Sequence, residues 1–211
     1  HRKHSRVQLE VVMAVKVLGV CGSTREGSRT KILVETALAA AVESGAEARV
    51  LDLREVQLPI FETRREDVWE LPPVTKIVEW AEWADAFILG TPEYHGGISG
   101  ALKNWMDYLY DELSGKLCGV VSASGGGGGT VSILATKQSF AYCHGFNLPF
   151  HAGTRGSDFE GGKLISEKVR DRLVRLGHDV VRYAPVLRKT FKEARELGRD
   201  DPRSGFAGFH A

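Results

Sequence analysis

Five short apolar runs, each followed by a segment with a helical pattern, place the strongest constraint on the fold of this 211-residue chain. The predicted strands are 15–21, 47–53, 86–90, 117–123 and 146–151, and the predicted helices are 28–44, 72–83, 98–110, 131–144 and 163–183. Strands that alternate with helices favour a parallel sheet covered by helices on both faces. The sequence therefore predicts a three-layer α/β sandwich around a five-stranded parallel sheet.

The loop after the first predicted strand carries groups that can hold a phosphate. Ser23, Ser28 and Thr30 supply hydroxyls, and Arg25 and Arg29 supply positive charge. The helix that begins near the second serine adds backbone N–H groups. The loop lacks both the lysine of a Walker loop and the GxGxxG spacing of a pyrophosphate turn. A monophosphate such as that of FMN therefore fits best, while a polar turn with a capping serine is the structural alternative.

The loop after the third predicted strand has the sequence Thr91-Pro92-Glu93-Tyr94-His95-Gly96-Gly97. Proline disfavours helix at the residue before it, and glycine lets the backbone approach a flat ligand closely. Open α/β sheets bind ligands at the carboxyl ends of their strands. Over residues 14–183, the chain with these two loops resembles the NADPH-dependent FMN reductase family of flavodoxin-like quinone, azo-dye and metal-ion reductases.

The resemblance implies a flavodoxin-like sheet of order 2-1-3-4-5, with FMN as the cofactor and NAD(P)H as the co-substrate. It further implies flavin contacts from the second loop, at Pro92, Glu93, Tyr94, His95 and Gly96. Many members of the family carry asparagine where this chain has His95. Tyr94 and His95 would shape the acceptor pocket, and no side chain is expected to be catalytic, because the flavin carries the chemistry. The alternatives are a core-edge role for Tyr94, and a helix cap or subunit contact for Glu93.

The loop after the fourth predicted strand contains five consecutive glycines, 125–129. The resemblance implies that Ser124, Gly125 and Gly126 contact the flavin. Backbone N–H groups in such a loop can stabilise negative charge on a reduced flavin. A flexible cover over the site accounts equally well for the far end of the loop, and a disordered surface loop is the remaining alternative.

Composition excludes several classes of function. A net charge of +1 gives no reason to expect a nucleic-acid or membrane partner. No apolar stretch reaches the roughly 18 residues of a membrane span. The three cysteines show no CxxC spacing, which fits a cytoplasmic protein, and Cys21 and Cys118 are expected to be buried within strands. Cys143, His144 and His151 lack regular ligand spacing, so no metal site is expected.

The two ends of the chain are expected to lie outside the folded domain. Residues 1–12 precede Met13, a plausible natural start, and are expected to be an extension, whether native or added by cloning. Residues 13–187 are expected to form one flavodoxin-like FMN-binding domain. Residues 188–211 form a charged, glycine-bearing tail, which predicts a surface arm or an oligomer contact. The resemblance implies a homodimer or a homotetramer.

The resulting hypothesis is an oxidoreductase that passes hydride from NAD(P)H to bound FMN and then to a small acceptor. The acceptor would be a quinone, an azo compound, a free flavin or an oxidised metal ion. Both substrates would use the same face of the flavin, which predicts ping-pong kinetics. A flavodoxin-type electron carrier and a non-enzymatic FMN-binding sensor are the alternatives.

Overall fold

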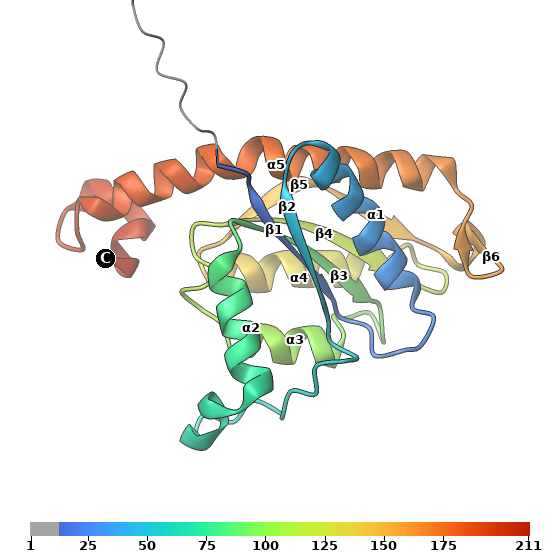
Figure 1. Ribbon diagram of the computed structural model, residues 1–211, viewed down its shortest axis with the longest axis horizontal. Helices are drawn as coiled ribbons and strands as arrows, with labels where there is room; N and C mark the ends of the chain where they lie inside the picture. Colours follow the sequence, from blue (N-terminus) through green and yellow to red (C-terminus); the bar gives the residue numbers. More distant parts are fainter. Residues whose placement is uncertain (1–12) are drawn as a thin grey trace, which may run out of the picture.

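The computed structural model describes residues 13–211, which contain a five-stranded parallel sheet (Figure 1). Its order is β2-β1-β3-β4-β5, which confirms the predicted topology. The strands are β1 (Lys16–Cys21), β2 (Glu47–Asp52), β3 (Ala86–Pro92), β4 (Leu117–Ala123) and β5 (Phe146–Thr154). The expectation for residues 1–12 lies outside the described residues.

Helices cover both faces of the sheet, α1 and α5 on one side and α2, α3 and α4 on the other (Figure 1). The helices are α1 (Arg29–Glu43), α2 (Pro72–Trp83), α3 (Gly100–Asp107), α4 (Thr130–Tyr142) and α5 (Glu167–Glu196), with short 3-10 turns η1 (Glu66–Glu70), η2 (Gly156–Asp158) and η3 (Pro202–His210). Along β3, Phe87 and Leu89 join the core under α2–α4, whereas Ala86 and Ile88 join the core under α1 and α5. Because both faces are covered, every residue of this strand is buried.

The start of the closing helix differs from its prediction. Lys163 and Leu164 form β7 (Lys163–Leu164), which pairs antiparallel with β6 (Phe159–Glu160). The helix α5 begins only at Glu167, where Ser166 caps it by accepting a hydrogen bond from the N–H of Val169. The predicted boundary was wrong because a two-residue strand is too short to leave a periodic pattern.

The end of the same helix also differs from its prediction. The helix α5 runs through Pro185 to Glu196 instead of ending at Tyr183. A proline removes one hydrogen bond from a helix and crowds the preceding turn. Ala184 and Phe191 are nevertheless buried on either side of it, so packing sustains the helix where the local sequence favours a break.

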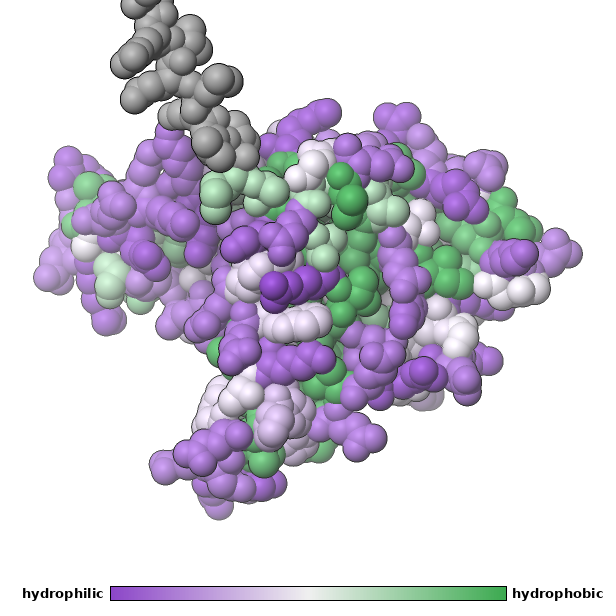
Figure 2. Space-filling view, viewed as in Figure 1, coloured by the Kyte–Doolittle hydropathy of each residue, from purple (hydrophilic) through white to green (hydrophobic). Residues whose placement is uncertain are grey.

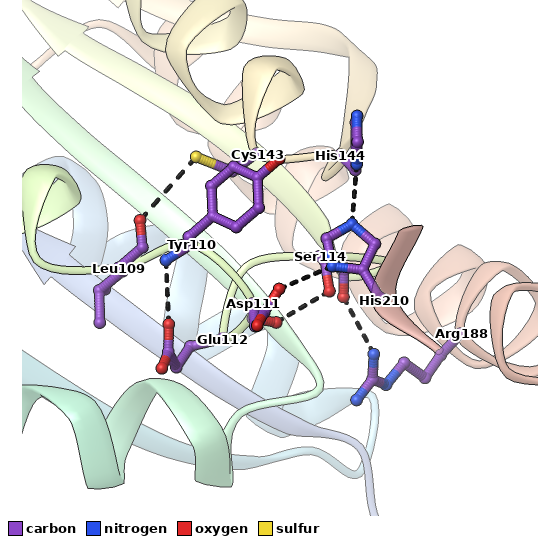
Figure 3. Close-up of polar contacts among 9 residues, drawn as sticks. All are labelled: Leu109, Tyr110, Asp111, Glu112, Ser114, Cys143, His144, Arg188 and His210. Atoms are coloured by element: carbon purple, nitrogen blue, oxygen red, sulfur yellow. Dashed lines mark hydrogen bonds and ion pairs between the residues drawn. The ribbon is translucent and has the colours of Figure 1, made fainter. Parts of the chain in front are cut away.

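The C-terminal segment folds back after α5 and packs on the loops at one end of the sheet (Figure 3). His210 Nδ1–H donates to Asp111 Oδ1 at 2.7 Å, and its Nε2 is hydrogen-bonded to His144 Nδ1 at 2.7 Å. From within α5, Arg188 Nη1 donates to the carbonyl of Ser114 in the same loop region at 3.0 Å. Hydrophilic residues cover most of the surface along α5 and this segment (Figure 2).

All three cysteines are buried and unpaired, which confirms the burial predicted for Cys21 and Cys118. Burial raises the pKa of the Cys21 and Cys143 thiols, so these sulfurs stay protonated at neutral pH. Among residues 13–211, no helix is long and apolar enough to cross a membrane.

Lys116 is a buried cation that fastens the end of α2 to the sheet. Its Nζ donates to the carbonyls of Ala81 at 2.7 Å and Glu82 at 3.3 Å, and only 2% of the residue is exposed. Burial, together with the nearby charge of Arg188, lowers the pKa of Lys116 to about 8. Its proton is therefore lost from the folded chain at a lower pH than from the unfolded chain.

We predict that this titration is visible in the stability of the protein. Between pH 8 and 10.5 the unfolded chain keeps a proton on Lys116 that the folded chain has lost, so this residue makes stability rise with pH in that window. From about pH 7.5 to about pH 9.5, the free energy of unfolding of the wild type should rise by about 1–2 kcal/mol relative to Lys116→Met. Urea unfolding of both proteins measures the difference, and parallel pH profiles would contradict the assignment.

Candidate functional site

A cleft of about 370 Å³ opens where β1, β3 and β4 end, between the three loops singled out in the sequence. Ten of the thirteen predicted site residues line it: Ser23, Arg25, Ser28, Arg29, Thr30, Pro92, Glu93, Tyr94, Ser124 and Gly125. Gly27 and Ala123 also contribute, and so does Gly162 from the turn between β6 and β7. The fold thus brings together residues that lie more than a hundred positions apart in the chain.

The loop after β1 presents hydroxyl and N–H groups to the cleft. Ser28 is the N-cap of α1, and its Oγ accepts a hydrogen bond from the N–H of Lys31 at 3.3 Å. The other N–H groups of that first turn have no acceptor within the helix. Arg25 and Arg29 are both exposed, and the guanidinium of Arg29 lies 5.1 Å from the centre of the Phe159 ring. The result is a positively charged pocket wall whose N–H and O–H groups can donate hydrogen bonds to an anion.

The remaining three predicted residues, His95, Gly96 and Gly126, lie in the same loops but outside the lining of the cleft. His95 and Gly96 form a two-residue turn, closed by hydrogen bonds between Tyr94 and Gly97 in both directions. Both turn residues have positive φ, 50° and 70°. This conformation favours asparagine or glycine and tolerates histidine, so the backbone accounts for the residue types at this turn.

Tyr94 and Glu93 occupy different environments within the second loop. Half of Tyr94 is exposed (53%), which excludes the core-edge alternative. Glu93 Oε2 accepts a hydrogen bond from the N–H of Ser132 at 3.0 Å. Glu93 therefore does cap a helix, as one alternative predicted. The capped helix is α4, whereas the alternative predicted the helix that directly follows Glu93. This contact ties the second loop to the third.

The glycine loop after β4 is held at both ends. Ser124 Oγ donates to the carbonyl of Thr154 at 2.9 Å and accepts from the N–H of Gly128 at 2.8 Å. The N–H of Gly156 donates to Gly125 O at 3.0 Å, and Arg155 Nε donates to Gly126 O at 3.1 Å. These bonds argue against both alternatives, a flexible cover and a disordered surface loop.

Sequence reasoning missed the contact that joins the first two loops. Ser99, the N-cap of α3, accepts from the N–H of Leu102 at 3.2 Å and donates to Gly22 O at 2.7 Å. The N–H of Ser99 donates to Thr91 Oγ1 at 3.0 Å. A Cβ at Gly22 would lie 2.7 Å from Leu102 Cβ and 2.8 Å from Gly90 O. A serine at a helix start signals a cap, but nothing in the sequence shows that its hydroxyl also reaches another strand.

Comparison with known proteins decides the family. The sequence pattern of the NADPH-dependent FMN reductases matches residues 15–155, which contain most of the cleft. This chain belongs to the NADPH-dependent FMN reductase family. FMN reductases of this kind are oxidoreductases that contain FMN and use NAD(P)H, as the resemblance in the sequence implied.

Individual relatives agree with this assignment. An NADPH azoreductase of Bacillus sp. (strain OY1-2) is 28% identical over 184 residues, covering 86% of this chain and 97% of the relative. An NAD(P)H:quinone oxidoreductase of Solanum tuberosum is 33% identical over 171 residues, covering 75% of this chain and 87% of the relative. Among solved structures, the flavoenzyme NAD(P)H:(acceptor) oxidoreductase FerB from Paracoccus denitrificans has a TM-score of 0.67 at 21% identity, covering 82% and 98% of the two chains. That structure supports the flavodoxin-like fold.

We predict that Ser99→Ala destabilises this FMN reductase by about 1–3 kcal/mol. The variant loses a helix cap and leaves the buried carbonyl of Gly22 without its donor. Ser166→Ala is the matched control, because it removes the serine cap of α5 and no other side-chain bond. It should cost about 1 kcal/mol. Urea unfolding compares the two, and equal losses would show that the bond to Gly22 adds nothing.

Proposed function

We propose that the cleft binds FMN and that NAD(P)H and a small acceptor react there in turn. The observation that supports this most is that two chemically different groups of residues line the cleft. One group is the hydroxyls, arginines and helix start of the β1 loop, and the other is Tyr94, Pro92 and bare glycine backbone. FMN has two corresponding parts, a phosphomonoester at one end and a flat ring at the other.

The phosphate would bind at the start of α1. Ser23, Ser28 and Thr30 are almost completely buried in the protein, so their positions are fixed before a ligand arrives. Arg25 makes no ion pair with a carboxylate of residues 13–211, which leaves its charge for an anion. Pre-positioned donors lose little conformational freedom on binding.

The flavin ring would lie between the second and third loops. A Cβ built on Gly125 or Gly126 would meet nothing within 4 Å, so the backbone there faces open space. Its N–H groups can then contact the polar edge of the ring, as the resemblance implies for Ser124, Gly125 and Gly126. The carbonyls of Gly125 and Gly126 already accept from Gly156 and Arg155. Glu93 is not the principal partner of the ring, because its carboxylate already accepts from Ser132.

Bound FMN supplies the redox chemistry, by accepting hydride from NAD(P)H and giving it to the acceptor. The protein orients both substrates over one exposed face of the cleft, where Tyr94 forms part of the wall. Because one face serves both substrates, the first product must leave before the acceptor enters. Quinones and azo compounds are the proposed acceptors, since relatives named for both reactions cover most of this chain.

We also propose that the protein forms homodimers or homotetramers through α4. Three large apolar side chains on this helix are highly exposed: Val131 (54%), Leu134 (58%) and Tyr142 (80%). Apolar side chains grouped on one helix are typical of an interface. Sedimentation equilibrium measures the mass in solution, and a monomer at all concentrations would contradict this proposal.

The proposed function predicts a flavin spectrum that bleaches with NADPH. Protein incubated with excess FMN and desalted should keep the flavin, lose its visible absorption on anaerobic addition of NADPH, and recover it when a quinone is added. Initial rates at several fixed quinone concentrations should give parallel double-reciprocal lines, the pattern of a ping-pong mechanism. Retained flavin that resists both NADPH and NADH would favour the carrier or the sensor.

The phosphate end predicts specific losses of FMN affinity. Arg25→Ala and Ser28→Ala should each weaken FMN binding about tenfold or more, since a hydrogen bond to a charged group contributes about 1.5–3 kcal/mol. Arg199→Ala and Ser166→Ala are the matched controls, an exposed arginine and a capping serine away from the cleft. Quenching of FMN fluorescence measures the affinities, and equal effects of variants and controls would refute the placement of the phosphate.

A further inference from the structure

A second cleft, of about 310 Å³, lies on the other side of the glycine loop, between the starts of α4 and α5. Gly127 and Gly128 line it, whereas Gly125 of the same loop lines the first cleft. Positive side chains dominate its wall: Arg155, Lys168 and Arg172, with His151 beside them and Asp158 as the one carboxylate. The proposed flavin site does not use any of these residues.

The positive side chains of this second cleft outnumber its one carboxylate, Asp158, which accepts from the backbone N–H of Arg155 at 2.7 Å. Among residues 13–211, no carboxylate forms an ion pair with Arg155, Lys168 or Arg172. Neighbouring positive charges of α5 are paired, Arg170 with Glu167 and Arg175 with Asp171. Lys168 and Arg172 stand one helical turn apart, a spacing at which like charges repel. The excess is local, because the whole chain carries a net charge of only +1.

Two of these cations are held in place by the fold. Arg172 Nη2 donates to the carbonyl of His151 at 2.7 Å, and its guanidinium lies 4.3 Å from the centre of the Phe150 ring. Arg155 Nε donates to Gly126 O, so this side chain spans the loop between the two clefts. Burial lowers the pKa of His151, and the charges of Lys137 and Arg172 lower it further. Of these causes, only the charge of Arg172 reports on the positive potential of the cleft.

We propose that the second cleft binds the 2′-phosphate of NADPH, which NADH lacks. A phosphomonoester carries close to two negative charges at neutral pH and accepts hydrogen bonds from several donors at once. Gly125, which lines the first cleft, and Gly128, which lines the second, are three positions apart and therefore at most about 11 Å from each other, so one extended dinucleotide can reach both clefts. Its nicotinamide would lie in the flavin cleft and its phosphate beside Lys168. This assignment rests on the proposed function, and it makes the enzyme prefer NADPH to NADH.

The test compares two nucleotides that differ by the one phosphate. Adenosine 2′,5′-bisphosphate and adenosine 5′-monophosphate are titrated calorimetrically into FMN-saturated protein, whose phosphate loop is already filled. The wild type should bind the bisphosphate about tenfold more tightly, as expected for one charge-assisted contact. Lys168→Gln should lose most of that preference, and Lys168→Arg should keep it. Lys192→Gln is the matched control, an exposed lysine of the same helix about 36 Å further along.

Kinetics then connect the site to turnover. Lys168→Gln should raise the KM for NADPH about tenfold and leave the KM for NADH unchanged. Equal binding of the two nucleotides by the wild type, or an unchanged preference in Lys168→Gln, would overturn the proposal. A protein that oxidises both dinucleotides without discrimination would refute only this assignment. A protein that discriminates between the nucleotides yet oxidises neither dinucleotide would refute the proposed function instead.

Discussion

The close approach of β1 and β3 at their carboxyl ends is the constraint on which the site depends. The N–H of Gly22 donates to Gly90 O at 2.8 Å, and Ser99 Oγ donates to Gly22 O. Both backbone polar groups of Gly22 are thus bonded, one to the end of β3 and the other to the start of α3. No side chain fits at position 22 without displacing Leu102 or the backbone of Gly90. This junction fixes the distance between the first two loops, and the cleft is the space that remains between them.

The third loop is tied to the other two by different bonds. Glu93 reaches the first turn of α4, and Ser124 joins the glycine run to the end of β5. A ligand-binding surface made of three loops would ordinarily be mobile. Here each loop is hydrogen-bonded to a neighbour or to a strand end. Most of the conformational entropy of the three loops is therefore lost when the protein folds, and the loops lose little more when a flavin binds.

The sequence predicted the strands and the three loops because both depend on local patterns, whereas the order of the strands in the sheet came from the family resemblance. Apolar runs identify buried strands, and glycine, serine and proline identify the turns between strands and helices. It could not predict the partner of Glu93, because the capped helix starts 37 residues later in the chain. It also missed Gly162, which reaches the cleft from a hairpin of two-residue strands, and the passage of α5 through Pro185. Each of these features depends on contacts between residues far apart in the chain, which local sequence patterns do not reveal.

The run of five glycines has a consequence for how this protein can be stabilised. Glycine gives the unfolded chain more conformations than any other residue, so the run raises the entropy that folding must overcome. At Gly125 and Gly126 the φ angle is not positive and an added methyl group would meet no protein atom, so nothing in the folded chain itself demands glycine. Glycine is needed there only to keep the space in front of the backbone open. At Gly125, which lines the cleft, selection for thermal stability and selection for an open cleft thus act in opposite directions.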